Sequence, residues 1–262
     1  MKKMLAILLA LLLALTTFAT AFAQEQIIVD ESTLNNSVTA TPDAEAANDK
    51  LVKVKEKEMK KLLAEIIEKE KKEIRSKDMV TALGSTYYNV NTPVCTQETS
   101  YWCGPASVQA VLQPHYIYQT QTDIAQRSGT TEAGSNSVNL ANTANYYIGD
   151  SWYYVAVDVT TKSSLYEKLK TDMYLGWAPI PLFKTQYLAY YGGRDLRHYS
   201  PTRDFTAAYY GSDPSAYDYN NSSVTLSDVN YNPSYGGIHT VTFNELYNAV
   251  NAAYGANKNF IY

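Results

Sequence analysis

Cysteine and histidine are scarce in this chain of 262 residues, which contains two cysteines and three histidines. Their positions do not have the spacing of a zinc site. The sequence also lacks a glycine-rich phosphate loop and an EF-hand calcium loop. We therefore expect no metal or organic cofactor, and any chemistry must depend on a few individual side chains.

A strong net charge is also absent, because the formal charge at pH 7 is only −4. Residues 49–78 carry 11 Lys and Arg against 8 Asp and Glu, a balance of +3. Residues 79–262 carry 9 against 13, a balance of −4. Neither part is charged enough to indicate nucleic-acid binding. Their opposite signs predict a mutual attraction.

Long apolar runs are absent beyond the first 23 residues. That N-terminal stretch has Lys2 and Lys3, then a run of apolar residues over 5–15, and the small-x-small sequence that ends at Ala23. This pattern is typical of a secretory signal peptide, residues 1–23, cut after Ala23. An uncleaved anchor is the alternative, but the run is short for a membrane span. We expect a secreted or cell-surface protein with bacterial-type export and no stable membrane span after cleavage.

The segment 24–80 divides into two parts. Residues 24–48 are polar and without a period, which predicts disorder. Residues 49–77 predict one long amphipathic helix, capped at its start by Asn48 or Asp49. Its apolar stripe comprises Val52, Met59, Leu62, Leu63, Ile66, Ile67 and Ile74.

Residues 81–262 form the predicted folded domain, and all 24 tyrosines lie within it. Capping residues and periodicity predict helices at 103–112, 122–127, 137–147, 163–174 and 244–253, the last one capped by Thr242. Strands are predicted at 152–159, 179–183, 197–207 and 224–229. Helices first and strands later indicate an α+β fold. We interpret the pairs of adjacent tyrosines mostly as packing residues with a hydrated hydroxyl.

Gln97 and Cys103 carry the most specific signal in the chain. Cys103 stands at the start of a predicted helix, where the partial positive charge favours a thiolate. The side-chain amide of Gln97, six residues upstream, can donate a hydrogen bond to an oxyanion that forms beside the sulfur. A nucleophile and an oxyanion donor are half of an acyl-transfer site. A buried cysteine at the start of a core helix is the alternative, but it does not explain Gln97.

The run Gln-x5-Cys-Gly-Pro-Ala-Ser, from Gln97 to Ser107, resembles the papain-like cysteine peptidases. It is most similar to family thirty-nine of these enzymes, the bacteriocin double-glycine leader peptidases and their secreted relatives. The resemblance is close over residues 92–113 and looser over 114–262, and it does not reach 1–80. It implies a papain-like fold over 81–262, with a nucleophile helix packed on a C-terminal antiparallel sheet, and a peptide or protein substrate.

In this family a His-Tyr pair begins a strand in the second half and supplies the general base, which implies His198 here. The next strand ends in Asp or Asn, which implies Asp228 as the residue that orients the imidazole. Asp228 precedes Val229 rather than the usual proline, so Asn230 is the fallback. His239 is the alternative base and is interpreted as a loop residue. His115 lies near the far end of the nucleophile helix, roughly 12 Å from Cys103.

Two further features leave alternatives open. Cys95 is interpreted as a small buried residue on the strand that leads into the site, or as the partner of Cys103 in a reversible redox disulfide. The helix at 49–77 is interpreted as a propeptide that covers the groove and inhibits the enzyme. The alternatives for that helix are a solvated stalk and a coiled-coil dimer.

The sequence therefore predicts an exported cysteine-type peptidase with Cys103, His198, Asp228 and Gln97 at its site. Transglutaminase-like transfer and hydrolysis of cell-wall amides use the same chemistry and stay open. A binding module that keeps the fold without catalysis is the alternative from another class.

Overall fold

The computed structural model describes residues 39–76, 83–149, 152–255 and 257–262. All of them belong to one compact unit of the chain. The predicted signal peptide and residues 24–38 of the predicted disordered segment lie outside the described residues. Within the described part, none of the helices combines the length and apolar character that crossing a bilayer requires.

The helix α2 (Pro42–Ser76) begins seven residues earlier than the sequence predicts. The predictions of disorder up to residue 48 and of a cap at Asn48 or Asp49 are therefore wrong for this stretch. Thr41 and Pro42 mark this helix start in the sequence. Thr41 Oγ1 accepts a hydrogen bond from the backbone N–H of Ala44, and Pro42 occupies the first helical position.

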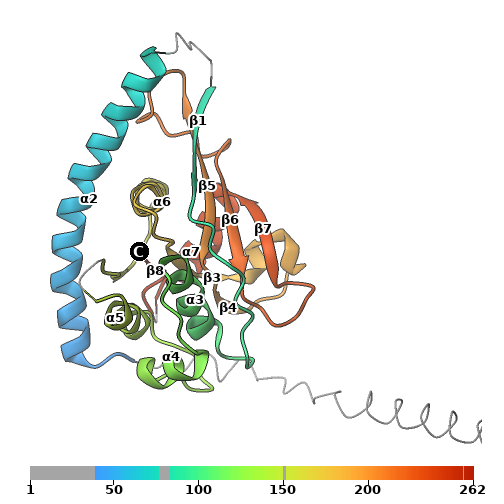
Figure 1. Cartoon of the computed structure of the whole chain (residues 1–262). Helices are drawn as coiled ribbons and strands as arrows, with labels where there is room; N and C mark the ends of the chain where they lie inside the picture. The colour runs from blue at the N-terminus through green and yellow to red at the C-terminus, as the bar shows by residue number, and fades with distance from the viewer. Residues whose placement is uncertain (1–38, 77–82, 150–151, 256) are drawn as a thin grey trace, which may run out of the picture. The chain divides into compact units, whose positions relative to one another are not determined.

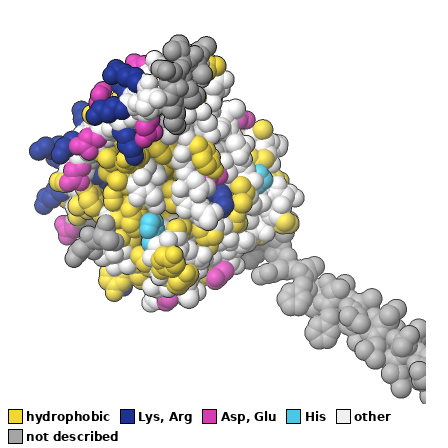
Figure 2. Space-filling view, turned by 45° about the horizontal axis from the view of Figure 1, so that its top comes forward, with side chains coloured by type: hydrophobic (Ala, Val, Ile, Leu, Met, Phe, Trp, Pro, Cys, Tyr) yellow, Lys and Arg dark blue, Asp and Glu magenta, His cyan; other side chains and the backbone are white. Residues whose placement is uncertain are grey.

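One face of α2 packs on α5 (Ser137–Ile148), α6 (Lys162–Tyr174) and β2 (Ala156–Val157). Figure 1 shows α2 running along α5 and α6. Three of its four buried residues are polar (Asn48, Lys55 and Glu70), so this contact has a polar part beside the apolar side chains of Leu51, Val52 and Met59, which pack on the core. The outward side keeps the charge, and Figure 2 shows basic and acidic side chains gathered on the flank that α2 forms.

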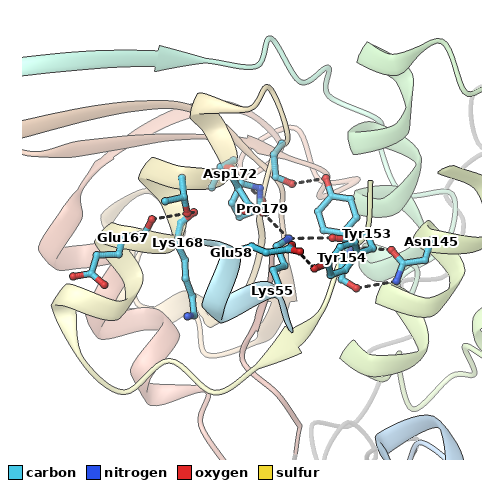
Figure 3. A network of polar contacts seen from close by, with 12 residues as sticks. Lys55, Glu58, Asn145, Tyr153, Tyr154, Glu167, Lys168, Asp172 and Pro179 are labelled. Atoms are coloured by element: carbon cyan, nitrogen blue, oxygen red, sulfur yellow. Dashed lines mark hydrogen bonds and ion pairs between the residues drawn. The ribbon is translucent and has the colours of Figure 1, made fainter. Parts of the chain in front are cut away.

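Lys55 is the centre of this polar contact (Figure 3). Its Nζ lies 3.3 Å from Asp172 Oδ2 of α6 and donates to the carbonyl of Tyr153 at 3.0 Å. Further along the helix, Lys170 and Glu70 form a second ion pair at 2.6 Å, and Tyr88 donates to Glu70 at 2.5 Å. These buried pairs join α2 to the rest of the unit.

The other helices confirm the sequence-based predictions closely. They are α3 (Cys103–Leu112), α4 (Gln121–Ser128), α5, α6 and α7 (Phe243–Ala252). Thr242 caps α7, as the sequence predicts, and it does so in a reciprocal capping box with Glu245. Gly129 ends α4 in the left-handed conformation. Helix α3 is buried on nearly all sides and packs on α4 and α5.

The first sheet is antiparallel, with strand order β1-β5-β6-β7. Its strands are β1 (Leu83–Asn89), β5 (Thr202–Tyr210), β6 (Ser223–Asp228) and β7 (Gly237–Thr242). Helix α6 packs on β5, and Figure 1 shows this sheet on the opposite side of α6 from α2.

The second sheet has strand order β2-β8-β3-β4. It contains β2, β3 (Ile180–Lys184), β4 (Arg197–Tyr199) and β8 (Phe260–Ile261). The strand predicted at 152–159 is reduced to two residues, and residues 154–157 are buried on both sides rather than alternating. The strand predicted at 197–207 is two strands, because the chain leaves this sheet at β4 and enters the first sheet at β5.

Candidate active site

Cys103 is the first residue of α3, and its side chain is half-buried. No side chain caps the start of this helix, and its first turn contains no acidic residue. The free N–H groups of the first turn and the helix dipole therefore place positive potential around the sulfur.

Gly104 and Pro105 explain why the helix starts where it does. A Cβ on Gly104 would lie 2.5 Å from Ser135 Oγ and 2.9 Å from Leu140 Cδ1, so only glycine lets the helix start approach this segment. Pro105 needs no hydrogen-bond partner in the first turn. Together these residues fix the position of Cys103 against α5.

His198 lies on β4, which packs against α3 and pairs with β3. Its side chain is buried, 5% exposed, and a ring edge faces Phe183. The side chain is close enough to Cys103 for the sulfur to contribute to the raised pKa of His198. Its Nε2 lies 2.9 Å from Asp228 Oδ1, so Nδ1 is the ring nitrogen left for Cys103.

Asp228 is the last residue of β6 and is fully buried. Because His198 belongs to the second sheet and Asp228 to the first, this hydrogen bond joins the two sheets. Asp228 Oδ1 also accepts from the backbone N–H of Asn230 at 2.9 Å. Its Oδ2 accepts from the hydroxyls of Tyr190 at 2.7 Å and Tyr191 at 2.9 Å. Four donors therefore surround one carboxylate.

The electrostatics of the pair follow from these contacts. Burial alone raises the pKa of Asp228. The charge of His198 and the hydrogen bonds that Asp228 accepts outweigh burial, so the pKa of Asp228 lies below its ordinary value. Burial lowers the pKa of His198, but the charge of Asp228, the hydrogen bond to Asp228 and the proximity of Cys103 raise it to about 10. Asp228 is thus ionised and His198 protonated near neutral pH, with the cation beside Cys103.

No family model matches the chain, and no curated protein matches it. The chain is similar to solved peptidase domains. A double-glycine motif protease from an AMS/PCAT transporter, solved with the leader peptide, is 16% identical with a TM-score of 0.40, covering 62% of this chain and 87% of that one.

Two further structures are similar to this chain. The peptidase domain of Streptococcus ComA, a bifunctional ABC transporter of a quorum-sensing pathway, is 14% identical with a TM-score of 0.42, over 66% of this chain and 96% of that one. A C39-like peptidase from Bacillus anthracis is 13% identical with a TM-score of 0.44, over 67% and 96%. At such low identities and TM-scores, the chemistry has to be argued from the residues of this site.

Gln97 is buried and lies next to the Asp228 end of β6, because its backbone N–H donates to the carbonyl of Val229 at 2.8 Å. Its side-chain Nε2 donates to the carbonyl of Thr99 at 2.7 Å. An amide NH₂ carries two hydrogens, so this contact leaves one for another acceptor. Oε1 is buried without a hydrogen-bond partner among the described residues.

The other two histidines have different surroundings. His239 lies on strand β7, so the prediction of a loop residue is wrong. Its ring stacks on Tyr190, with centroids 4.0 Å apart and planes within 1°. His115 ends the short helix η1 (Gln113–His115) after α3 and stacks on Trp177 at 3.5 Å. His198 is the histidine that neighbours Cys103 and is hydrogen-bonded to Asp228.

Cys95 and Cys103 are both free thiols. Cys95 lies on an irregular segment rather than a strand and is half-buried. Burial raises the pKa of the Cys95 thiol to about 11, so this side chain stays protonated near neutral pH. A redox link between the two cysteines stays a prediction.

Tyr190 and Tyr191 are the residues that the sequence analysis missed. Both were grouped with the packing tyrosines, and nothing in a Tyr-Tyr pair distinguishes them from the adjacent tyrosines at 146–147 or 153–154. Only the fold brings their hydroxyls to Asp228. In the described part of the chain, no group of three or more His, Cys, Asp or Glu side chains is arranged to hold a metal ion.

Proposed function

We propose that this chain is an exported cysteine peptidase that hydrolyses peptide bonds with Cys103, His198, Asp228 and Gln97. The observation that carries the proposal is the position of His198, which neighbours Cys103 and forms a 2.9 Å hydrogen bond with Asp228. Nucleophile, base and orienting carboxylate in this order are the requirement for nucleophilic acyl transfer.

The reaction follows from these positions. The Cys103 sulfur attacks the carbonyl carbon of the substrate, and the electron pair of the C=O bond moves to oxygen. When the tetrahedral intermediate collapses, His198 gives its proton to the leaving amine and a thioester remains. Water then attacks the thioester, His198 takes a proton from this water, and the acid product leaves with Cys103 restored. Asp228 holds the imidazole and balances its charge throughout.

The oxyanion of each tetrahedral intermediate needs hydrogen-bond donors. The second hydrogen of the Gln97 amide is one, and the backbone N–H of Cys103 at the helix start is the other. The bond from Gln97 to the Thr99 carbonyl supports this role, since it fixes the orientation of the amide before the substrate binds.

Export is inferred from the sequence, whereas self-inhibition can be compared with the contacts of α2. We infer export from the pattern of residues 1–23 alone. The expectation that the N-terminal helix covers the site has no support in its contacts. Within the described residues, the hydrogen bonds and ion pairs that α2 makes outside itself go to residues of the α5–α6 side, β1 and the loop at Asp213. None goes to Gln97, Cys103, His198 or Asp228.

The direct test is mass spectrometry of a peptide library incubated with the purified protein. The wild type should produce cleaved peptides with a gain of one water, and Cys103→Ala should produce none. His198→Ala should remove nearly all activity, whereas His239→Ala should cost far less. Gln97→Ala should lower kcat by roughly 10²–10³, the scale for one oxyanion donor. Cleavage by Cys103→Ala would overturn the proposal.

The same experiment separates the rival functions. Joined peptides with loss of ammonia would indicate transglutaminase-like transfer, and activity confined to cell-wall peptides would indicate an amide hydrolase. For a binding module, iodoacetamide near neutral pH is decisive, and Cys95 is an internal control because it stays protonated. Labelling of Cys103 no faster than Cys95 would indicate a fold without the chemistry.

A further inference from the structure

The second oxygen of the Asp228 carboxylate has a site of its own. Oδ1 faces His198, while Oδ2 accepts from two phenolic hydroxyls, of Tyr190 at 2.7 Å and of Tyr191 at 2.9 Å. The carboxylate is fully buried. A buried carboxylate that lacks donors is either protonated or rotates toward other partners. The two hydroxyls oppose both changes, because they stabilise the charge and hold Oδ2 in place.

Backbone geometry makes this double contact feasible. Tyr190 and Tyr191 belong to the short 3-10 helix η4 (Ala189–Tyr191) in the segment between β3 and β4. Adjacent residues on a strand point to opposite faces, whereas here both rings lie on one side, with centroids 4.8 Å apart. Gly192 closes the turn with a φ of +60°, a conformation that favours glycine.

Each ring is held by a neighbour from another element. Tyr190 stacks on His239 of β7, and Tyr191 stacks on Tyr235 at 4.9 Å with planes 18° apart. The Tyr191 hydroxyl also accepts from Asn230 Nδ2 at 3.4 Å. The hydroxyls are therefore ordered in advance, so that little conformational freedom is lost when they bind the carboxylate.

We propose that Tyr190 and Tyr191 are positioning residues of the active site, which keep the Asp228 carboxylate ionised and keep Oδ1 directed at His198. The proposal rests on the peptidase function proposed above for its catalytic consequences. Hydrogen bonds from neutral donors stabilise the charged form of a carboxylate. Because the two hydroxyls are neutral, they do not compete with His198 for the negative charge of Asp228.

The groups that surround Asp228 define the expected pH behaviour. His198 faces it from β4 and the two tyrosines from η4, with Cys103 of α3 beyond His198 and His239 of β7 behind Tyr190. Without the hydroxyls, the Asp228 carboxylate takes up a proton at a higher pH. It then no longer balances the imidazolium, and the reactivity of Cys103 is lost at a higher pH than in the wild type.

The experiment compares Tyr190→Phe, Tyr191→Phe and the double variant in a Cys95→Ser background. Tyr166→Phe is the matched control, because its buried hydroxyl donates at 2.8 Å to the carbonyl of Ala208 and not to Asp228. The rate of Cys103 alkylation is measured from pH 4 to 9, without substrate, and kcat and KM are measured on a cleaved peptide.

Each single variant should lower the alkylation rate and kcat by about tenfold and the double variant by roughly 100-fold, the scale of hydrogen bonds to a charged group. The acid limb of the alkylation profile should move to higher pH, KM should stay unchanged, and Tyr166→Phe should match the background. Profiles of all three variants that superimpose on Tyr166→Phe would overturn the proposal.

The two readouts keep this proposal separate from the proposed function. A wild type that cleaves no peptide, with a displaced alkylation profile in the variants, would reject the peptidase but not the positioning role. An active wild type with unaffected variants would reject the positioning role alone. Tyr190 is only partly buried, so Tyr190→Phe remains informative if the Tyr191 variant does not fold.

Discussion

Two aspartates, Asp228 and Asp172, are both fully buried and each forms a hydrogen bond with one basic side chain, yet their environments differ. Asp228 receives four hydrogen bonds, from His198, Asn230, Tyr190 and Tyr191. Asp172 receives one from Lys55 on Oδ2, and its Oδ1 has no hydrogen-bond partner among the described residues. The first carboxylate lies in the candidate site and the second under α2.

This difference sets the direction in which the pKa of each carboxylate moves. Burial raises the pKa of Asp172 to about 6, although Lys55 opposes it, and burial lowers the pKa of Lys55 to about 8. At Asp228 the donors outweigh burial and the pKa falls below its ordinary value. At Asp172 the charges of Lys55 and Lys168 lower the pKa but do not outweigh burial, whereas at Asp228 the charge of His198 and the hydrogen bonds together do.

Replacing each aspartate by asparagine should give the largest contrast. Asp228→Asn should lower kcat by roughly 10³–10⁴, the scale for the orienting carboxylate of a catalytic triad, because an amide cannot balance the imidazolium. Asp172→Asn should leave kcat unchanged, since its contacts go to α2. Peptide cleavage rates of both variants, measured below their melting temperatures, test this contrast. Equal losses would remove the distinction.

The next effect concerns stability rather than rate. Lys55→Met should destabilise the fold by about 3–5 kcal/mol, because it leaves the buried carboxylate of Asp172 unpaired. The double variant Lys55→Met with Asp172→Leu should recover most of this loss, because the charge is gone as well. Urea unfolding provides the free energies. As a control, kcat of the folded fraction should not change in either variant.

If the double variant were as unstable as Lys55→Met alone, the loss would come from packing and not from the unpaired charge.

The smallest effect is a pH dependence of the Lys55–Asp172 pair. The folded state binds the Asp172 proton more tightly than the unfolded chain, because the pKa rises from 3.8 to about 6. The stability contributed by Asp172 therefore decreases as pH rises through this interval. The folded state binds the Lys55 proton less tightly, with a pKa lowered from 10.5 to about 8, so its contribution increases as pH rises above 8.

Relative to the apolar double variant, the wild type should thus be least stable between pH 6 and 8. Urea midpoints of both proteins at acidic, neutral and alkaline pH provide the measurement. A stability difference that is flat across this range would mean that the pair titrates like exposed groups.

The sequence predicts those elements whose signals are local. Helix α7 has its cap at Thr242, α4 has its terminal Gly129, and the nucleophile helix begins at Cys103 where the sequence places it. The strands β1, β7 and β8 were missed. Strands are defined by partners far away in the chain, and the glycine pair at 236–237, where β7 begins, favours a loop when it is considered alone.

The candidate site shows the same limit. The sequence shows the positions of Gln97 and Cys103 and the order of His198 and Asp228. The structure brings Cys103, His198 and Asp228 together. Their catalytic roles stay predictions. Tyr190 and Tyr191 had no signal, because their role arises from the meeting of two sheets, a long-range event that local patterns do not encode.

Asn48 has a consequence for solubility. Its side-chain amide donates to the carbonyl of Ala156 at 2.9 Å and accepts from the N–H of the same residue at 2.9 Å, which copies the pairing of a neighbouring strand. Strand β2 lies at the edge of its sheet, and an open edge is a template for aggregation. One side chain of α2 thus occupies the hydrogen-bonding groups through which another chain could extend this sheet.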